Sequence, residues 1–164
     1  MNPQQWFTEQ LHVGRNAFVW SAKQIPEDRR DTQPPAPEEL GEWSAQRHIH
    51  HMWNYEHNVA IPSMRLWLAE ALTPEKYKEH LTAYVSEEGN ENNYSYVTIL
   101  DLFTKGRDEQ INMLAQFDDT HWEETQKAVW GEPTLHWVVS KTFQHTMEHG
   151  NTLMRLILFW DEMI

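Results

Sequence analysis

The sequence predicts an all-α protein, a four-helix bundle with long loops before the second helix and between the second and third. Apolar residues recur at helical spacing through most of the chain, and no apolar–polar alternation is long enough for a strand. Four long helices in one chain are typical of a bundle with a single interior core. The 164 residues suit one domain, which we expect to span residues 1–164.

The first helix is expected from Pro3 to about Lys23. Asn2 can cap it, and a proline is tolerated in the first turn of a helix. Its apolar residues recur at helical spacing: Trp6, Phe7, Leu11, Phe18 and Trp20. A proline-rich connection follows over residues 25–37, and this composition is incompatible with a helix.

The second long helix is expected to start after Ser44, which can serve as its N-cap, and to reach about Ala71. Pro62 falls inside this range. Because proline lacks the backbone N–H and its ring clashes with the preceding turn, we expect a kink or break near Ile61.

The rest of the chain predicts one short and two long helices. Thr73 can cap a short helix over about residues 74–85, and the polar residues 86–93 form a loop. The third long helix is expected over about residues 94–117. Residues 131–134 then stop one element and cap the last helix, over about residues 134–163.

Charge and composition exclude several functions. The chain carries 25 acidic and 13 basic residues, a net charge of −12, which argues against nucleic-acid binding because phosphate contacts need clustered Lys and Arg. No run of about 18 apolar residues could span a membrane. The N-terminus lacks the basic and apolar regions of a signal peptide, so we expect a cytoplasmic protein.

The chain has no cysteine and ten histidines, so any metal must be held by nitrogen and oxygen ligands. His145 and His149 lie four residues apart in the last predicted helix and share one face. Val138 and Leu156 lie near that face, which therefore points largely into the bundle. Two adjacent buried imidazoles repel each other when charged, whereas a shared metal ion uses both as neutral ligands.

The sequence leaves the partners of this pair open. A third ligand would come from His48, His50 or His51, all at the start of the second long helix, and periodicity does not choose among them. The stretch from His145 to His149 also spells H-x-x-E-H, an inverted zinc-peptidase pattern in which Glu148 would be the general base. The simpler interpretation places Glu148 on the solvated face. A di-iron site would need two Glu-x-x-His motifs from different helices, and only one stretch of the sequence has this spacing.

Two regions resemble the DinB/YfiT-like superfamily of four-helix metalloproteins. Trp43-Ser44, followed by His51, is similar to the motif that opens the family's second helix and ends in a metal ligand. Glu56 matches the family's usual acidic residue. The stretches 130–135 and 143–150 are similar to the last-helix pattern that supplies the other two ligands. The resemblance covers most of the chain as one DinB-like domain and implies metal binding by His51, His145 and His149, with His50 as the first alternative to His51.

The resemblance also implies a chemistry. Some members look like transferases for low-molecular-weight thiols, so a metal-dependent thiol S-transferase with such a thiol as cosubstrate is the expected activity. The alternatives are a metal-dependent hydrolase and a non-catalytic, metal-stabilised stress-response module. Three imidazoles leave a coordination position open, and they suit zinc, nickel, copper and iron alike. We expect zinc or nickel.

A homodimer is also expected, since bundles of this family often pair through helix faces. The nine tryptophans exceed what one core of this size needs. Four of them are candidates for a partly exposed apolar patch: Trp20, Trp53, Trp67 and Trp160.

Overall fold

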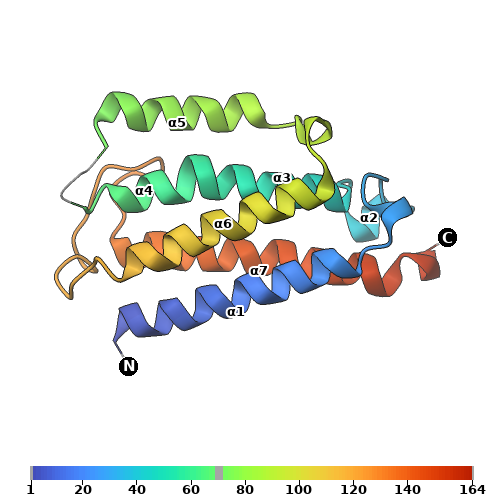
Figure 1. The fold of residues 1–164 in the computed structure, drawn as a ribbon, viewed down its shortest axis with the longest axis horizontal. Coiled ribbons are helices and arrows are strands. Elements are labelled where there is room, and N and C mark those ends of the chain that lie inside the picture. The colour runs from blue at the N-terminus through green and yellow to red at the C-terminus, as the bar shows by residue number, and fades with distance from the viewer. Residues whose placement is uncertain (1, 69–71, 164) are drawn as a thin grey trace.

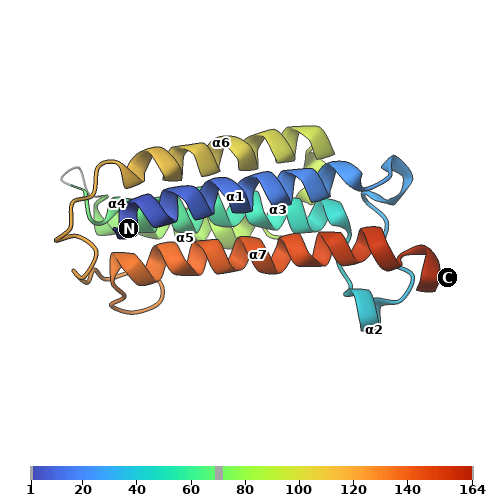
Figure 2. The ribbon, with the colours of Figure 1, turned by 90° about the horizontal axis from the view of Figure 1, so that it is seen from below.

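Four long helical segments pack as a bundle in the computed structural model, which describes residues 2–68 and 72–163. The first and last helices, α1 (Pro3–Gln24) and α7 (Leu135–Phe159), run in the same direction. α3 (Ala45–Tyr55) and α6 (Tyr96–Leu114) run the opposite way (Figures 1 and 2). No strand forms within the described residues. The predicted all-α bundle is confirmed.

The predicted helix starts are confirmed by capping hydrogen bonds. Asn2 accepts from the N–H of the third residue of α1, and Ser44 does the same for α3. Thr73 caps α5 (Pro74–Glu87), and Thr134 caps α7. Each side chain satisfies a backbone donor that has no partner within the helix.

The second long helix is broken by a π-helical turn. α3 ends at Tyr55, residues Glu56–Ala60 form the π-helical turn η2, and α4 continues over Ile61–Arg65. The break therefore lies in the turn before Pro62 rather than at Ile61 itself. A π turn accommodates the proline because it shifts the carbonyl that the ring would otherwise meet. α4 ends at Arg65, six residues before the predicted end near Ala71, which itself lies outside the described residues.

The connections contain more helix than the sequence predicts. A single 3-10 turn, Glu27–Arg29, and a short helix, α2 (Pro37–Leu40), form in the proline-rich connection. Two i→i+3 bonds hold this 3-10 turn, from the N–H of Arg29 to the carbonyl of Pro26 and from the N–H of Arg30 to the carbonyl of Glu27. Flanking prolines do not block them. Another 3-10 turn, Glu91–Asn93, lies just before α6.

The helix α5 connects two helices that run in the same direction, α3 and α6. Since α3 and α6 run in the same direction, the chain must return along the bundle between them, and α5 makes this return along the outside of α3 (Figure 1). It also extends two residues beyond the predicted end at Val85, to Glu87. This extension brings Glu87 and Glu88 beside α3.

The apolar core comprises two large clusters and a small third one around Tyr55, Val59 and Ala60. The two large clusters pack at different depths along the bundle. One cluster gathers around Phe18, Ile49 and Phe103, and the other around Leu11, Met64 and Val138. Between them lies a layer of buried polar side chains, all at most 1% exposed: Glu56, Arg107, Gln110, Thr142 and Thr146. We call these five residues the polar layer.

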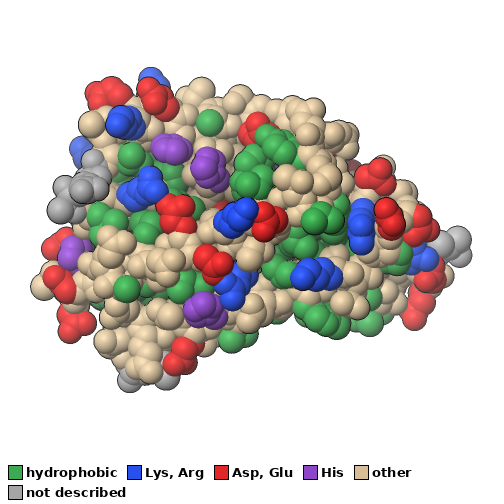
Figure 3. Space-filling model, in the orientation of Figure 1, with side chains coloured by type: hydrophobic (Ala, Val, Ile, Leu, Met, Phe, Trp, Pro, Cys, Tyr) green, Lys and Arg blue, Asp and Glu red, His purple; other side chains and the backbone are tan. Residues whose placement is uncertain are grey.

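The surface combines mixed charge with isolated aromatic side chains. Acidic and basic side chains are interspersed over α5, α6 and α1 (Figure 3), and ion pairs from Arg15 to Asp108 and from Arg65 to Glu109 tie α6 to α1 and α4. No helix within the described residues has an apolar stretch long enough to cross a bilayer.

The expectation of an exposed tryptophan patch is wrong for two of its four members. Trp67 and Trp160 are buried, at 4% and 7% exposure, because each completes one of the two core clusters. Trp53 is partly buried against the core, whereas Trp20 is 57% exposed on α1.

Candidate metal centre

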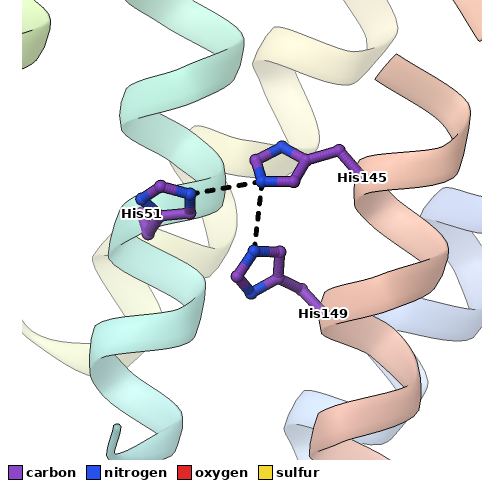
Figure 4. A group of neighbouring side chains, drawn as sticks. All are labelled: His51, His145 and His149. Carbon is purple, nitrogen blue, oxygen red and sulfur yellow. Dashed lines mark hydrogen bonds between the residues drawn. The ribbon is translucent and has the colours of Figure 1, made fainter. Parts of the chain in front are cut away.

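Three histidines, one from α3 and two from α7, converge in the space between these two helices (Figure 4). The Nε2 atom of His145 lies 3.2 Å from Nε2 of His51 and 3.1 Å from Nε2 of His149. One ring nitrogen of each lies within 4.8 Å of those of the other two, so the group could hold a metal ion. We call these three residues the histidine cluster.

Local structure accounts for this convergence. His145 and His149 are one turn apart on α7, so their side chains project from the same face toward α3. His51 lies two turns into α3, whose start is fixed by the Ser44 cap. Aromatic rings enclose the cluster. The ring centroid of Tyr55 lies 4.3 Å from that of His145, and the Trp43 centroid lies 5.1 Å from that of His51.

Burial keeps the imidazoles of His145 and His149 neutral. It lowers the pKa of His145 to about 3 and that of His149 to about 2, and the neighbouring histidines add to the effect because like charges repel. Neutral imidazole is the form that binds metals. The donor set, three imidazole nitrogens directed at one another, fits a divalent ion.

The outward-facing Nδ1 atoms of the three rings have different partners. Nδ1 of His51 lies 2.9 Å from Oε1 of Glu88, and Nδ1 of His149 lies 2.8 Å from Nδ1 of His48. Nδ1 of His145 is buried without a hydrogen-bond partner. Burial also lowers the pKa of His48, to about 4, so this neighbour too remains neutral at pH 7.

The other sequence candidates lie elsewhere. His50, the alternative to His51, is directed to Oε1 of Glu87 at 3.2 Å and packs against Trp53. Glu148 is exposed and accepts a hydrogen bond from Gln144, as the solvated-face interpretation expects.

Glu56 is part of the polar layer and not of the histidine cluster. Its Oε1 accepts a hydrogen bond from Nη2 of Arg107 at 2.5 Å, and its Oε2 accepts from Gln110. The same Arg107 nitrogen lies 2.5 Å from Oγ1 of Thr146, the residue after His145. Burial raises the pKa of Glu56, and the Arg107 charge opposes this shift. The layer ties η2 and α6 to the part of α7 that carries the cluster.

A cavity of about 300 Å³ lies beside the cluster, lined by His48, Trp43, Thr152 and Arg155 among others. It adjoins the cluster through the contact between His48 and His149. Four larger cavities, of about 660, 680, 500 and 470 Å³, are lined by other parts of the described chain and by no histidine. The cavity of about 300 Å³ is therefore the one whose lining includes a residue in contact with the cluster.

The sequence did not predict the roles of three residues around the site. His48 was considered only as a ligand, although its spacing of three from His51 places both on one side of α3. Glu88 carries no sequence signal, since it lies in a stretch predicted to be a loop and is 37 residues from its partner. Arg107 had a faint signal, a basic residue within a mostly apolar helix face.

The fold and the cluster define a class of protein, a four-helix bundle with three histidines able to hold a metal ion between its second and last long helices. The family model of the DinB superfamily matches residues 10–153. The chain belongs to the DinB superfamily, as the sequence motifs indicated. No curated protein and no solved structure matches it significantly.

Proposed function

We propose that His51, His145 and His149 bind one divalent metal ion through their Nε2 atoms. The convergence of these three atoms carries the proposal. Desolvating polar rings without strong partners costs free energy, and a shared metal ion would supply such a partner to all three partly buried imidazoles. Zinc and nickel are the ions we expect, since both accept imidazole nitrogen.

We further propose that the centre serves a transferase acting on a low-molecular-weight thiol. When bound, a divalent ion would supply Lewis-acid activation of a thiol or a water. Three protein ligands leave room for a fourth, which is typical of catalytic sites. The chain has no cysteine, so the sulfur must come from a cosubstrate, and the cavity beside His48 offers a place for the rest of that molecule.

The metal proposal is tested by replacing each ligand. His51→Ala, His145→Ala and His149→Ala should each lower the bound metal at least tenfold, because three-ligand binding depends on every ligand. Elemental analysis of the purified proteins gives the metal content directly.

Matched controls come from histidines outside the cluster. His12→Ala, His80→Ala and His121→Ala should bind as much metal as the unchanged protein. Full occupancy in the His145→Ala/His149→Ala double variant would refute the assignment.

The transferase proposal is tested with the metal-loaded protein, a small thiol and an electrophile. We expect conjugation that is lost in His145→Ala. Hydrolysis of esters or amides without conjugation would favour a hydrolase. A cobalt-substituted protein whose spectrum ignores added thiol, with neither activity present, would favour a structural role for the ion.

A further inference from the structure

We propose that Glu88 is a positioning residue for the metal centre, and that it holds the His51 imidazole with Nδ1–H outward and the Nε2 lone pair toward His145 and His149. The inference rests on the proposed metal binding. It assigns a role in the centre to the end of α5, a helix outside the four-helix bundle.

The geometry of His51 supports this orientation. Its Nδ1 lies 2.9 Å from Oε1 of Glu88 on one side, and its Nε2 lies 3.2 Å from Nε2 of His145 on the other. A carboxylate can only accept a hydrogen bond, so the proton of a neutral ring resides on Nδ1. Nε2 then carries the free lone pair that a metal ion needs. A carboxylate behind a ligand histidine also increases the basicity of the ligand.

Glu88 is itself held in place by buried groups. Nδ2 of Asn54, a fully buried side chain on α3, donates to the Tyr84 carbonyl at 2.9 Å and to Oε1 of Glu88 at 3.3 Å. Asn58 in turn donates to Oδ1 of Asn54 at 2.8 Å. This chain of amides fixes α5 against α3 with the carboxylate directly behind His51.

The other two histidines of the cluster lack such a partner. Nδ1 of His149 faces another imidazole, His48, and Nδ1 of His145 has no partner. His51 is therefore the member of the cluster whose orientation and basicity depend on a carboxylate. Loss of the Glu88 carboxylate should therefore weaken metal binding without removing a ligand.

The neighbouring pair of residues provides an internal control. His50 and Glu87 form the same kind of contact one residue earlier, with His50 Nε2 3.2 Å from Glu87 Oε1. This contact also joins α3 to α5, yet His50 is outside the cluster. Removing Glu87 thus tests the loss of a helix contact, whereas removing Glu88 tests the loss of ligand positioning.

The experiment measures zinc affinity by competition with a chromophoric chelator. Glu88→Ala should weaken binding by about 10–100-fold, the usual cost of losing such a partner. Glu88→Gln should recover part of the loss, since its amide oxygen still accepts from Nδ1–H. Glu87→Ala should bind zinc as the unchanged protein does. Equal affinities for Glu88→Ala and the unchanged protein, or equal losses for both alanine variants, would overturn the inference.

The tautomer of His51 gives a readout that does not need metal. Long-range ¹H–¹⁵N correlation spectra of the metal-free protein should show His51 protonated at Nδ1, and this preference should weaken in Glu88→Ala but not in Glu87→Ala. A His51 ring protonated at Nε2 in the unchanged protein would overturn the inference. Failure of the unchanged protein to bind either zinc or nickel would instead refute the proposed function, and the spectra would still decide whether Glu88 sets the tautomer of His51.

Discussion

At the scale of single residues, the site depends on keeping imidazoles uncharged. His48, His145 and His149 all have lowered pKa values, and burial is the largest cause for each. The same burial that prepares these rings for a metal ion makes the metal-free protein sensitive to acid, because protonation then places positive charges together inside the bundle.

We expect the metal-free protein to lose stability as the pH falls below about 6.5. In the unfolded chain the imidazoles titrate near that value, whereas in the folded chain the pKa values of His145 and His149 are about 3 and about 2. Between these limits the unfolded chain binds more protons. The free energy of unfolding should therefore reach its full value above pH 7. As the pH is lowered, it should fall by up to about 1.4 kcal/mol per pH unit for each imidazole.

Urea unfolding of metal-free protein between pH 7.5 and 5 measures this dependence. The His145→Ala/His149→Ala variant should show a clearly smaller slope, since it lacks two of the titrating rings. A urea midpoint that does not change with pH in the unchanged protein would contradict the expectation.

At the scale of secondary-structure elements, the polar layer joins a π-helical turn to two α-helices. Glu56 belongs to the π-helical turn η2, Arg107 to α6 and Thr146 to α7. The pair of Glu56 and Arg107 is fully buried, so each charge depends on the other for compensation. Because Thr146 follows His145 directly, the contacts of the layer fix the position of His145 relative to α3.

We expect Arg107→Met to destabilise the fold by about 3–5 kcal/mol, because it leaves the Glu56 carboxylate buried without its ion-pair partner. The double variant Arg107→Met/Glu56→Leu should be more stable than this single variant, since apolar residues of similar volume can replace a buried ion pair at little cost. Urea unfolding at pH 7 measures both. A loss below about 1 kcal/mol for the single variant would show that the pair is not closely coupled.

At the scale of the whole molecule, an apolar stripe on α1 is the best candidate for an interface between two copies of the chain. Trp6, Val13 and Trp20 are 41%, 60% and 57% exposed. They are spaced seven residues apart, so they lie on one side of the helix, as in the seam of a coiled coil. This spacing fits another helix with the same repeat, and we propose a homodimer through α1.

The homodimer should be visible as twice the chain mass of 19.6 kDa in light scattering at micromolar concentration. Val13→Glu should give the single-chain mass, because it places a charge in the middle of the stripe. Its metal content should not change, since the histidine cluster is on other helices. A single-chain mass for the unchanged protein would contradict the proposal.

The sequence by itself determined the helices and the general chemistry of the site. Local hydrogen bonds fix the caps at Asn2, Ser44 and Thr134, and a spacing of four places His145 and His149 on one helix face. These features depend on residues a few positions apart, which sequence patterns record directly. The family resemblance supplied His51, and the structure brings it to the other two.

Only the tertiary structure decided which groups surround these residues. His48, His50 and His51 fall within four positions, and periodicity left all three open because α3 is buried on several sides. The packing of α5 along α3 turns His50 toward Glu87 and places Glu88 behind His51. Such contacts join residues 37 positions apart. They depend on how whole helices pack, which no local pattern specifies.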